Sequence, residues 1–168
     1  SLTSKSGITL NNAGHQFGTL TMKGAAITLV EAAAIDLDTV TAASLTLTAA
    51  GAITGTSKLD VSGSTSLNAE ANKIELTSAA NNLQGKVSII AGDVVVTNNT
   101  ATTLGTTSAL GKLTLTSTGA IQGADVINIS GPVDLNAKGT SVSLTNTKNQ
   151  FGTVTLLGKD DVTLVEDT

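Results

Sequence analysis

Short runs in which apolar and polar residues alternate recur along the whole chain, such as LTLT at 113–116 and KIEL at 73–76. A period of two places one side of a strand in a core and the other side in water. The runs are too short for helices, and they contain many Thr, Val and Ile residues, whose branching at Cβ favours strands. Turn residues such as Asn81-Asn82 and Gly131-Pro132 separate the runs. The pattern predicts an all-β protein of short strands.

The chain also repeats itself over a longer distance. LTLTAAGAI at 45–53 recurs as LTLTSTGAI at 113–121, and LNA at 67–69 recurs at 135–137, after the same interval. FGT at 17–19 returns at 151–153, after two such intervals. The repeated unit is therefore about 67 to 68 residues long. We interpret the chain as two and a half copies of it, at about 11–78 and 79–146 with a partial copy at 147–168.

Within this unit the apolar runs sort into three columns, each of which advances by about 22 residues per step. The leading residues of the first column are Leu20, Leu45, Leu67, Val87, Leu113, Leu135 and Val154. Those of the second are Ile27, Ile53, Ile74, Val94, Ile121, Val142 and Val162. Those of the third are Phe17, Ile35, Leu59, Leu83, Leu104, Ile127 and Phe151. Three strands in each step predict one triangular coil, repeated seven to eight times.

The predicted fold is a right-handed parallel β-helix, with the hand taken from the general rule for parallel crossovers. Residues 1–168 then form a single solenoid segment, cut from a longer array and about 35–40 Å long at a coil spacing of about 4.8 Å. An antiparallel sandwich also uses short strands, but it does not require one fixed step in all three columns. The aliphatic and aromatic side chains expected to stack in the core are Phe17, Leu37, Leu45, Leu47, Ile53, Leu67, Ile74, Leu83, Leu113, Leu115, Ile121, Leu135, Leu144 and Phe151.

The composition argues against several classes of partner and site. The net charge is −4, and all nine basic residues are Lys, which argues against nucleic acid and against an anionic membrane surface as partners. No apolar run approaches the length that spans a bilayer, and the absence of Cys excludes disulfides and thiolate metal sites. The first residues lack the plan of a signal peptide, so we expect any export signal to lie outside this segment.

The motifs FGTLT (17–21), ITLVE (27–31), IDL (35–37), LTLTAAGAIT (45–54) and LNA (67–69), in this order, resemble the strand repeats of filamentous-haemagglutinin-like exoproteins of Gram-negative bacteria. The resemblance covers essentially the whole chain. It implies secretion through an outer-membrane partner by the two-partner route, a location at the bacterial cell surface, and a long fibrous shaft. It also implies a role in adhesion, cell contact or biofilm.

Three groups of residues are candidates for a site. His15 is the only histidine, and we interpret it as a solvated turn residue. Asp36 and Asp60 are expected at outward third-column positions of adjacent coils, with Asn128 at a later one, where two carboxylates could bind Ca²⁺; solubility is the favoured explanation for them. A flat outward ladder is expected from Thr21, Thr46, Asn68, Ser88, Thr114, Asn136 and Thr155.

These features favour a structural role over catalysis. No Arg, Tyr or Trp is present to hold a sugar substrate, so we expect no enzyme activity, no catalytic residue and no cofactor. The first hypothesis is an extracellular shaft whose main partner is the rest of its own repeat array. The alternatives are a module that binds glycans or Ca²⁺ through the Thr/Asn face, and end-to-end self-association through the unpaired backbone of the rod ends.

Overall fold

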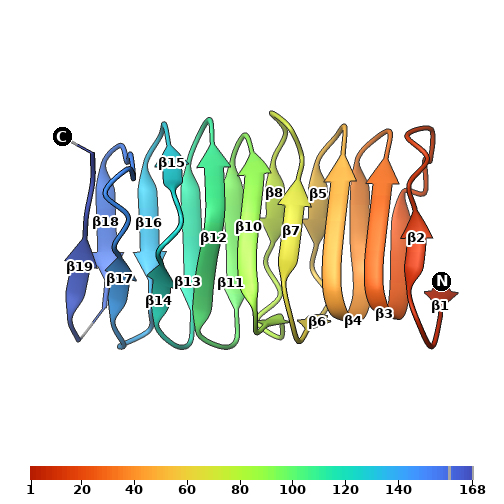
Figure 1. Ribbon diagram of the computed structural model, residues 1–168, viewed down its shortest axis with the longest axis horizontal. Coiled ribbons are helices and arrows are strands. Elements are labelled where there is room, and N and C mark those ends of the chain that lie inside the picture. The colour runs from red at the N-terminus through yellow and green to blue at the C-terminus, as the bar shows by residue number, and fades with distance from the viewer. Residues whose placement is uncertain (159, 168) are drawn as a thin grey trace.

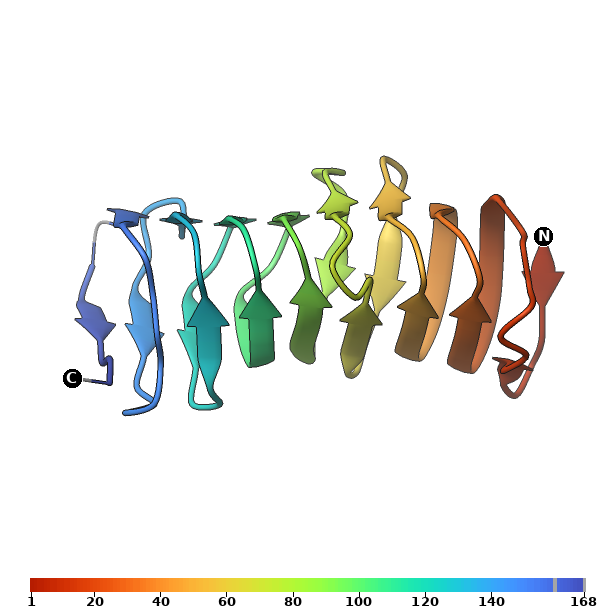
Figure 2. The same ribbon diagram turned by 90° about the horizontal axis from the view of Figure 1, so that it is seen from above.

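The fold is a parallel β-solenoid, seen in a computed structural model that describes residues 1–158 and 160–167. Its 19 strands form one continuous sheet, and every pairing between strands is parallel. The chain makes about 8 turns, with register partners roughly 20 residues apart. The turns follow one another along the long axis, from the N-terminus at one end to the C-terminus at the other (Figures 1 and 2). The predicted all-β parallel solenoid is confirmed.

Each complete turn supplies one strand segment to each of three faces, which we name A, B and C in chain order. Face A contains residues 19–20 of β3 (Thr19–Glu31), residues 35–37 of β4 (Ile35–Ala49), β5 (Ile53–Gly55), β8 (Ile74–Leu76), β11 (Val94–Asn98), β13 (Leu113–Ser117), β16 (Val133–Asn136) and β18 (Val154–Leu157).

Face B contains β1 (Leu2–Thr3), residues 22–24 of β3, residues 40–42 of β4, β6 (Leu59–Val61), β9 (Asn82–Leu83), residues 102–104 of β12 (Thr102–Ala109), β14 (Ile121–Gly123), β17 (Val142–Leu144) and β19 (Val162–Leu164). Face C contains β2 (Ile8–Leu10), residues 26–31 of β3, residues 44–49 of β4, β7 (Thr65–Asn68), β10 (Lys86–Ala91), residues 107–109 of β12, β15 (Ile127–Ile129) and finally Gln150.

The core lies between the three faces and is almost entirely aliphatic. Of the predicted core residues, the twelve aliphatic ones are buried, with at most 2% of their surface exposed. Phe17 was wrongly placed in the core. It precedes β3 at a corner, remains 38% exposed and packs against the ring of His15 with 4.9 Å between ring centroids. Phe151 is half-buried against the edge of the core.

The predicted columns are correct over short stretches but cross from face to face. Leu45 and Leu67 do lie on face C, and Leu113 and Leu135 on face A. The predicted step from Leu20 to Leu45 is too long, because Leu20 pairs with Leu37 on face A. The second and third columns contain the same error at several of their longer steps.

The true step between register partners is roughly 20 residues, shorter than the predicted one. Leu113 therefore pairs with Val133, and Leu115 pairs with Leu135. A column stays on one face at its shorter steps and changes face at single long steps, as from Leu20 to Leu45 and from Val87 to Leu113.

The repeated unit does not contain a whole number of turns. The strand segments that begin at 45, 53, 59, 65, 74, 82, 86, 94, 102 and 107 precede the one at 113, which makes ten segments, or three turns plus one segment. Consequently Leu45 lies on face C, whereas its repeat equivalent Leu113 lies on face A. Each copy of the unit is rotated by one face relative to the copy before it.

Candidate functional site

The predicted hydroxyl and amide ladder is divided between two faces. Thr46 and Ser88 lie on face C with Ser66 between them in register, and Asn68 lies one outward position further along the same strand as Ser66. Thr114 and Thr155 lie on face A, where Asp134 and not Asn136 separates them. Thr21 belongs to neither column, because it sits at the bend between faces A and B and donates a hydrogen bond of 2.8 Å to Asp38. The prediction of a single continuous ladder is therefore wrong.

Face C carries two outward columns without charge at the centre of its strands. One column is Thr9, Thr28, Thr46, Ser66 and Ser88, and the other is Val30, Thr48, Asn68, Ile90, Ser108 and Asn128. Face A is different, because its central outward column includes the carboxylates of Asp36, Glu75 and Asp134. Face C is thus the less charged hydroxyl surface of the two.

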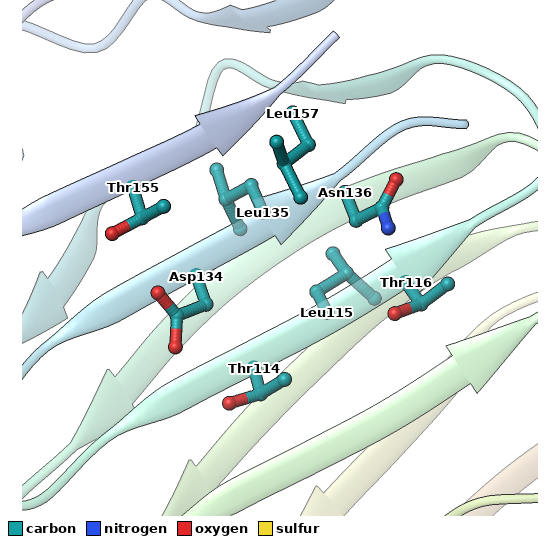
Figure 3. A pocket seen from close by; sticks show the side chains of 8 residues that line it. All are labelled: Thr114, Leu115, Thr116, Asp134, Leu135, Asn136, Thr155 and Leu157. Atoms are coloured by element: carbon teal, nitrogen blue, oxygen red, sulfur yellow. The ribbon is translucent and has the colours of Figure 1, made fainter. Parts of the chain in front are cut away.

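A shallow depression lies near the C-terminal end of face A (Figure 3). Thr114, Asp134 and Thr155 line one side of it in register, and Thr116, Asn136 and Leu157 line the other. Hydroxyl, amide and carboxylate groups point outward next to one exposed aliphatic side chain, Leu157. This arrangement can form hydrogen bonds with a polar ligand.

Asp36 and Asp60 do not lie side by side, contrary to the prediction. Asp36 is on face A and accepts a hydrogen bond of 3.2 Å from Thr54, whereas Asp60 is on face B and accepts one of 2.9 Å from Asn82. The later candidate, Asn128, lies on face C. In the described part of the chain, no three His, Cys, Asp or Glu side chains gather in a way that could hold a metal ion.

Three carboxyl groups are stabilised in their charged form by nearby donors. The hydrogen bond from Lys58, 2.7 Å away, lowers the pKa of Asp60, and the one from Lys73, 2.6 Å away, lowers the pKa of Glu75. The hydroxyl of Thr21, and then that of Ser57, lower the pKa of Asp38. All three groups are partly exposed and tie one strand to its neighbour or to the adjoining loop. These bonds stabilise the contacts between neighbouring segments at the surface of the rod.

His15 is not a simple solvated turn residue. It lies at the corner between faces C and A, where its carbonyl accepts a hydrogen bond of 2.8 Å from the amide of Ala32. This bond makes Glu31 its register partner on the next turn. Glu31 is buried, with 1% exposure, and its Oε1 accepts a hydrogen bond of 2.9 Å from the amide of Phe17.

The buried polar residues at the corners were not predicted as a group. Asn81, Asn98 and Asn149 are fully buried, and each bonds through its side chain to the backbone of another turn. Asn81 and Asn149 are separated by one repeat length, as are Asn98 and Glu166, so both belong to the repeat. That spacing was the available signal, because amides at turns are otherwise common and uninformative.

Residues 24–90 and 91–158 each match the family described as repeats of unknown function, DUF5649. These two matches cover most of the chain, and the chain therefore belongs to this repeat family. No curated protein and no solved structure matches it. In the described residues, no helix is long and apolar enough to cross a membrane. The two matched segments agree in length with the internal repeat, although their bounds differ in phase from those predicted.

Proposed function

We propose that this chain is a segment of the shaft of a long secreted bacterial surface protein, in which it holds adhesive regions away from the cell. The observation that carries the proposal is the stack of mainly aliphatic inward side chains that runs along the rod. Leu29, Leu47, Leu67 and Ile89 succeed one another in register on face C, and aliphatic side chains fill most inward positions of the other faces. Such a core extends by addition of turns and does not need a new centre.

The geometry gives the shaft a defined gain in length per repeat. At a spacing of about 4.8 Å per turn, a unit of three and one third turns adds about 16 Å, and the two matched repeats together add about 32 Å. The resemblance to filamentous-haemagglutinin-like exoproteins supports export by an outer-membrane partner and display at the cell surface. It also supports a role in cell contact or biofilm.

Two strains that carry variants of the full-length protein test the proposal, because one changes the length of the rod and the other changes only its surface side chains. One strain lacks residues 24–158. In a second strain these residues keep every inward side chain, while outward Thr, Ser and Asn residues are exchanged among themselves. We expect the deletion to shorten the fibre by about 32 Å in electron micrographs and to reduce attachment. The exchanged version should keep both the full fibre length and normal attachment. Loss of attachment by the exchanged version at full fibre length would reject the shaft role.

Face C supports a second candidate, the binding of neutral glycans, because its outward columns offer hydroxyl and amide groups without charge at the strand centres. Thr46 lies on this face, whereas Thr114 lies on face A in register with Asp134. If face C binds glycans, Thr46→Lys abolishes binding on a glycan array and Thr114→Lys leaves it intact. Equal binding by the unchanged chain and Thr46→Lys would exclude this candidate.

A further inference from the structure

Asn81 and Asn98 connect three successive turns at the corner between faces A and B. Oδ1 of Asn81 accepts the amide of Leu59 on the turn before, at 2.9 Å, and its Nδ2 donates to the carbonyl of Thr97 on the turn after, at 3.1 Å. Asn98 accepts the amide of Leu83 at 2.9 Å and donates back to the carbonyl of Leu83 at 3.1 Å. Both side chains are fully buried.

The same arrangement recurs one repeat later at a different corner. Asn149 accepts the amide of Ile127 at 2.9 Å and donates to the carbonyl of Val165 at 3.0 Å. Glu166, which is exposed, takes the place of Asn98 and accepts the amide of Phe151 at 2.9 Å. One repeat earlier, His15 and Glu31 occupy the equivalent positions. Glu31 accepts the amide of Phe17, whereas Nδ1 of the His15 ring has no hydrogen-bond partner in the described structure. We name these three pairs, His15–Glu31, Asn81–Asn98 and Asn149–Glu166, the corner pairs.

Two of the corner pairs lie where the regular backbone ladder is interrupted. Within the described strands β9 has no ladder pairing with β12, because Thr103 and Leu104 of β12 pair with Lys86 and Val87 of β10. Here Asn98 bonds to both backbone groups of Leu83. On face C, Gln150 forms only an isolated bridge with Asn128, next to Asn149, in the described part of the chain. At these corners the side chains therefore add interturn bonds to the few that the backbone makes.

The core alone does not select one register. Most inward positions on every face are Leu, Ile, Val or Ala, so a turn that slipped by one strand segment would still place mainly aliphatic side chains inward. The buried amides distinguish the registers, because in a slipped turn they would face backbone groups that already have partners. Each buried group left without its bond disfavours that register by a factor of about 5 to 150 in the equilibrium constant.

We propose that the corner pairs are register locks, which specify once per repeat which strand segment lies upon which. Sequence repetition makes slippage a general hazard in this protein, and buried polar residues are known to fix register in other repetitive assemblies. The proposal concerns how the chain chooses one conformation, and it holds whether or not the rod serves as a shaft.

Disulfide trapping tests the proposal in a chain that contains no cysteine of its own. Glu75 and Val95 are outward register partners on face A, on the two turns that the Asn81–Asn98 pair connects. Cysteines at 75 and 95 report the native register, and cysteines at 75 and 103 report a turn slipped by one segment. In the otherwise unchanged chain we expect only the first pair to form a disulfide.

Asn81→Leu/Asn98→Leu fills the corner with apolar side chains of similar size and removes the lock. We expect the 75–103 disulfide to form in this variant, at a yield at least fivefold above the background of the unchanged chain, and the amide NMR signals of the neighbouring turns to double. Thr65→Val is the matched control, since Thr65 is buried with no hydrogen-bond partner for its hydroxyl in the described structure, and it should give only the native disulfide. A folded double variant with one set of signals and only the 75–95 disulfide overturns the proposal.

The single variant Asn98→Ala, which keeps Asn81, provides the same test if the double variant does not fold. We expect it to show a smaller fraction of the slipped disulfide, and native disulfide alone in a folded Asn98→Ala also overturns the proposal. Failure of both variants to fold contradicts it too, because the corner pairs would then provide stability and not a choice between registers.

Discussion

Leu47 on face C offers a direct measure of how tightly the turns pack. It is fully buried, and its register partners Leu29 on one side and Leu67 on the other are both 1% exposed. Hydrogen bonds fix the spacing of these strands, so the neighbours cannot move together to fill the space of a lost side chain. We therefore expect Leu47→Ala to cost about 3–5 kcal/mol, the upper part of the usual range of about 2–5 kcal/mol for Leu→Ala in a core.

The matched control is Leu110→Ala, because Leu110 is 64% exposed at the surface of the same rod. Its expected cost is within about 0.5 kcal/mol of zero. Both variants are measured by equilibrium unfolding in guanidinium chloride, with the midpoint and the slope compared with those of the unchanged chain. A loss below about 1 kcal/mol for Leu47→Ala, or equal losses for the two variants, would refute the close packing of successive turns.

Two further predictions follow from the surface and the corners. Because hydrogen bonds from Thr21 and then Ser57 lower the pKa of Asp38 in the folded protein, its contribution to stability is present above about pH 4 and is lost as the pH falls through the folded value. Asp38→Asn should flatten the stability profile below about pH 4 in thermal melts, and an unchanged profile would speak against this bond. Gly131→Ala places a Cβ 2.7 Å from the backbone of Gly111, so we expect a loss of about 1–3 kcal/mol, whereas Gly24→Ala, with its nearest contact at 3.4 Å, should be neutral or stabilising. Equal melting temperatures for these two variants would contradict the steric argument.

The fold could be predicted from the sequence because alternation and repetition are strong, independent signals. Alternation identified the inward side chains, and the aliphatic part of the predicted core is correct. The prediction that Phe17 lies in the core was wrong, because alternation cannot distinguish the first residue of a strand from the corner before it. The partner of each strand was harder to predict, since Leu20 resembles Leu45 as much as it resembles its real partner Leu37.

The polar sites were predicted less well, for a related physical reason. Whether two outward residues become neighbours depends on the register, and an error of one strand segment places them on different faces. Asp36 and Asp60 were separated in this way, as were Thr46 and Thr114. The buried amides escaped prediction because a single Asn at a turn normally faces solvent, and only the three-dimensional stacking shows that Asn81 is enclosed.

The mismatch between repeat and turn has a consequence for any long array of this unit. Since each copy advances three turns and one third, equivalent side chains move to the next face with every repeat and return to the first face after three repeats, or about ten turns. At about 4.8 Å per turn this corresponds to about 48 Å of rod.

A side chain that recurs in every repeat is thereby displayed on all three faces, and no side of a long rod becomes a continuous sheet of one composition. Long uniform faces are templates for sheet-to-sheet association, so the rotation favours a rod that stays separate from its neighbours. That property suits the proposed spacer role, since one uniform face along a long array would need a repeat with a whole number of turns.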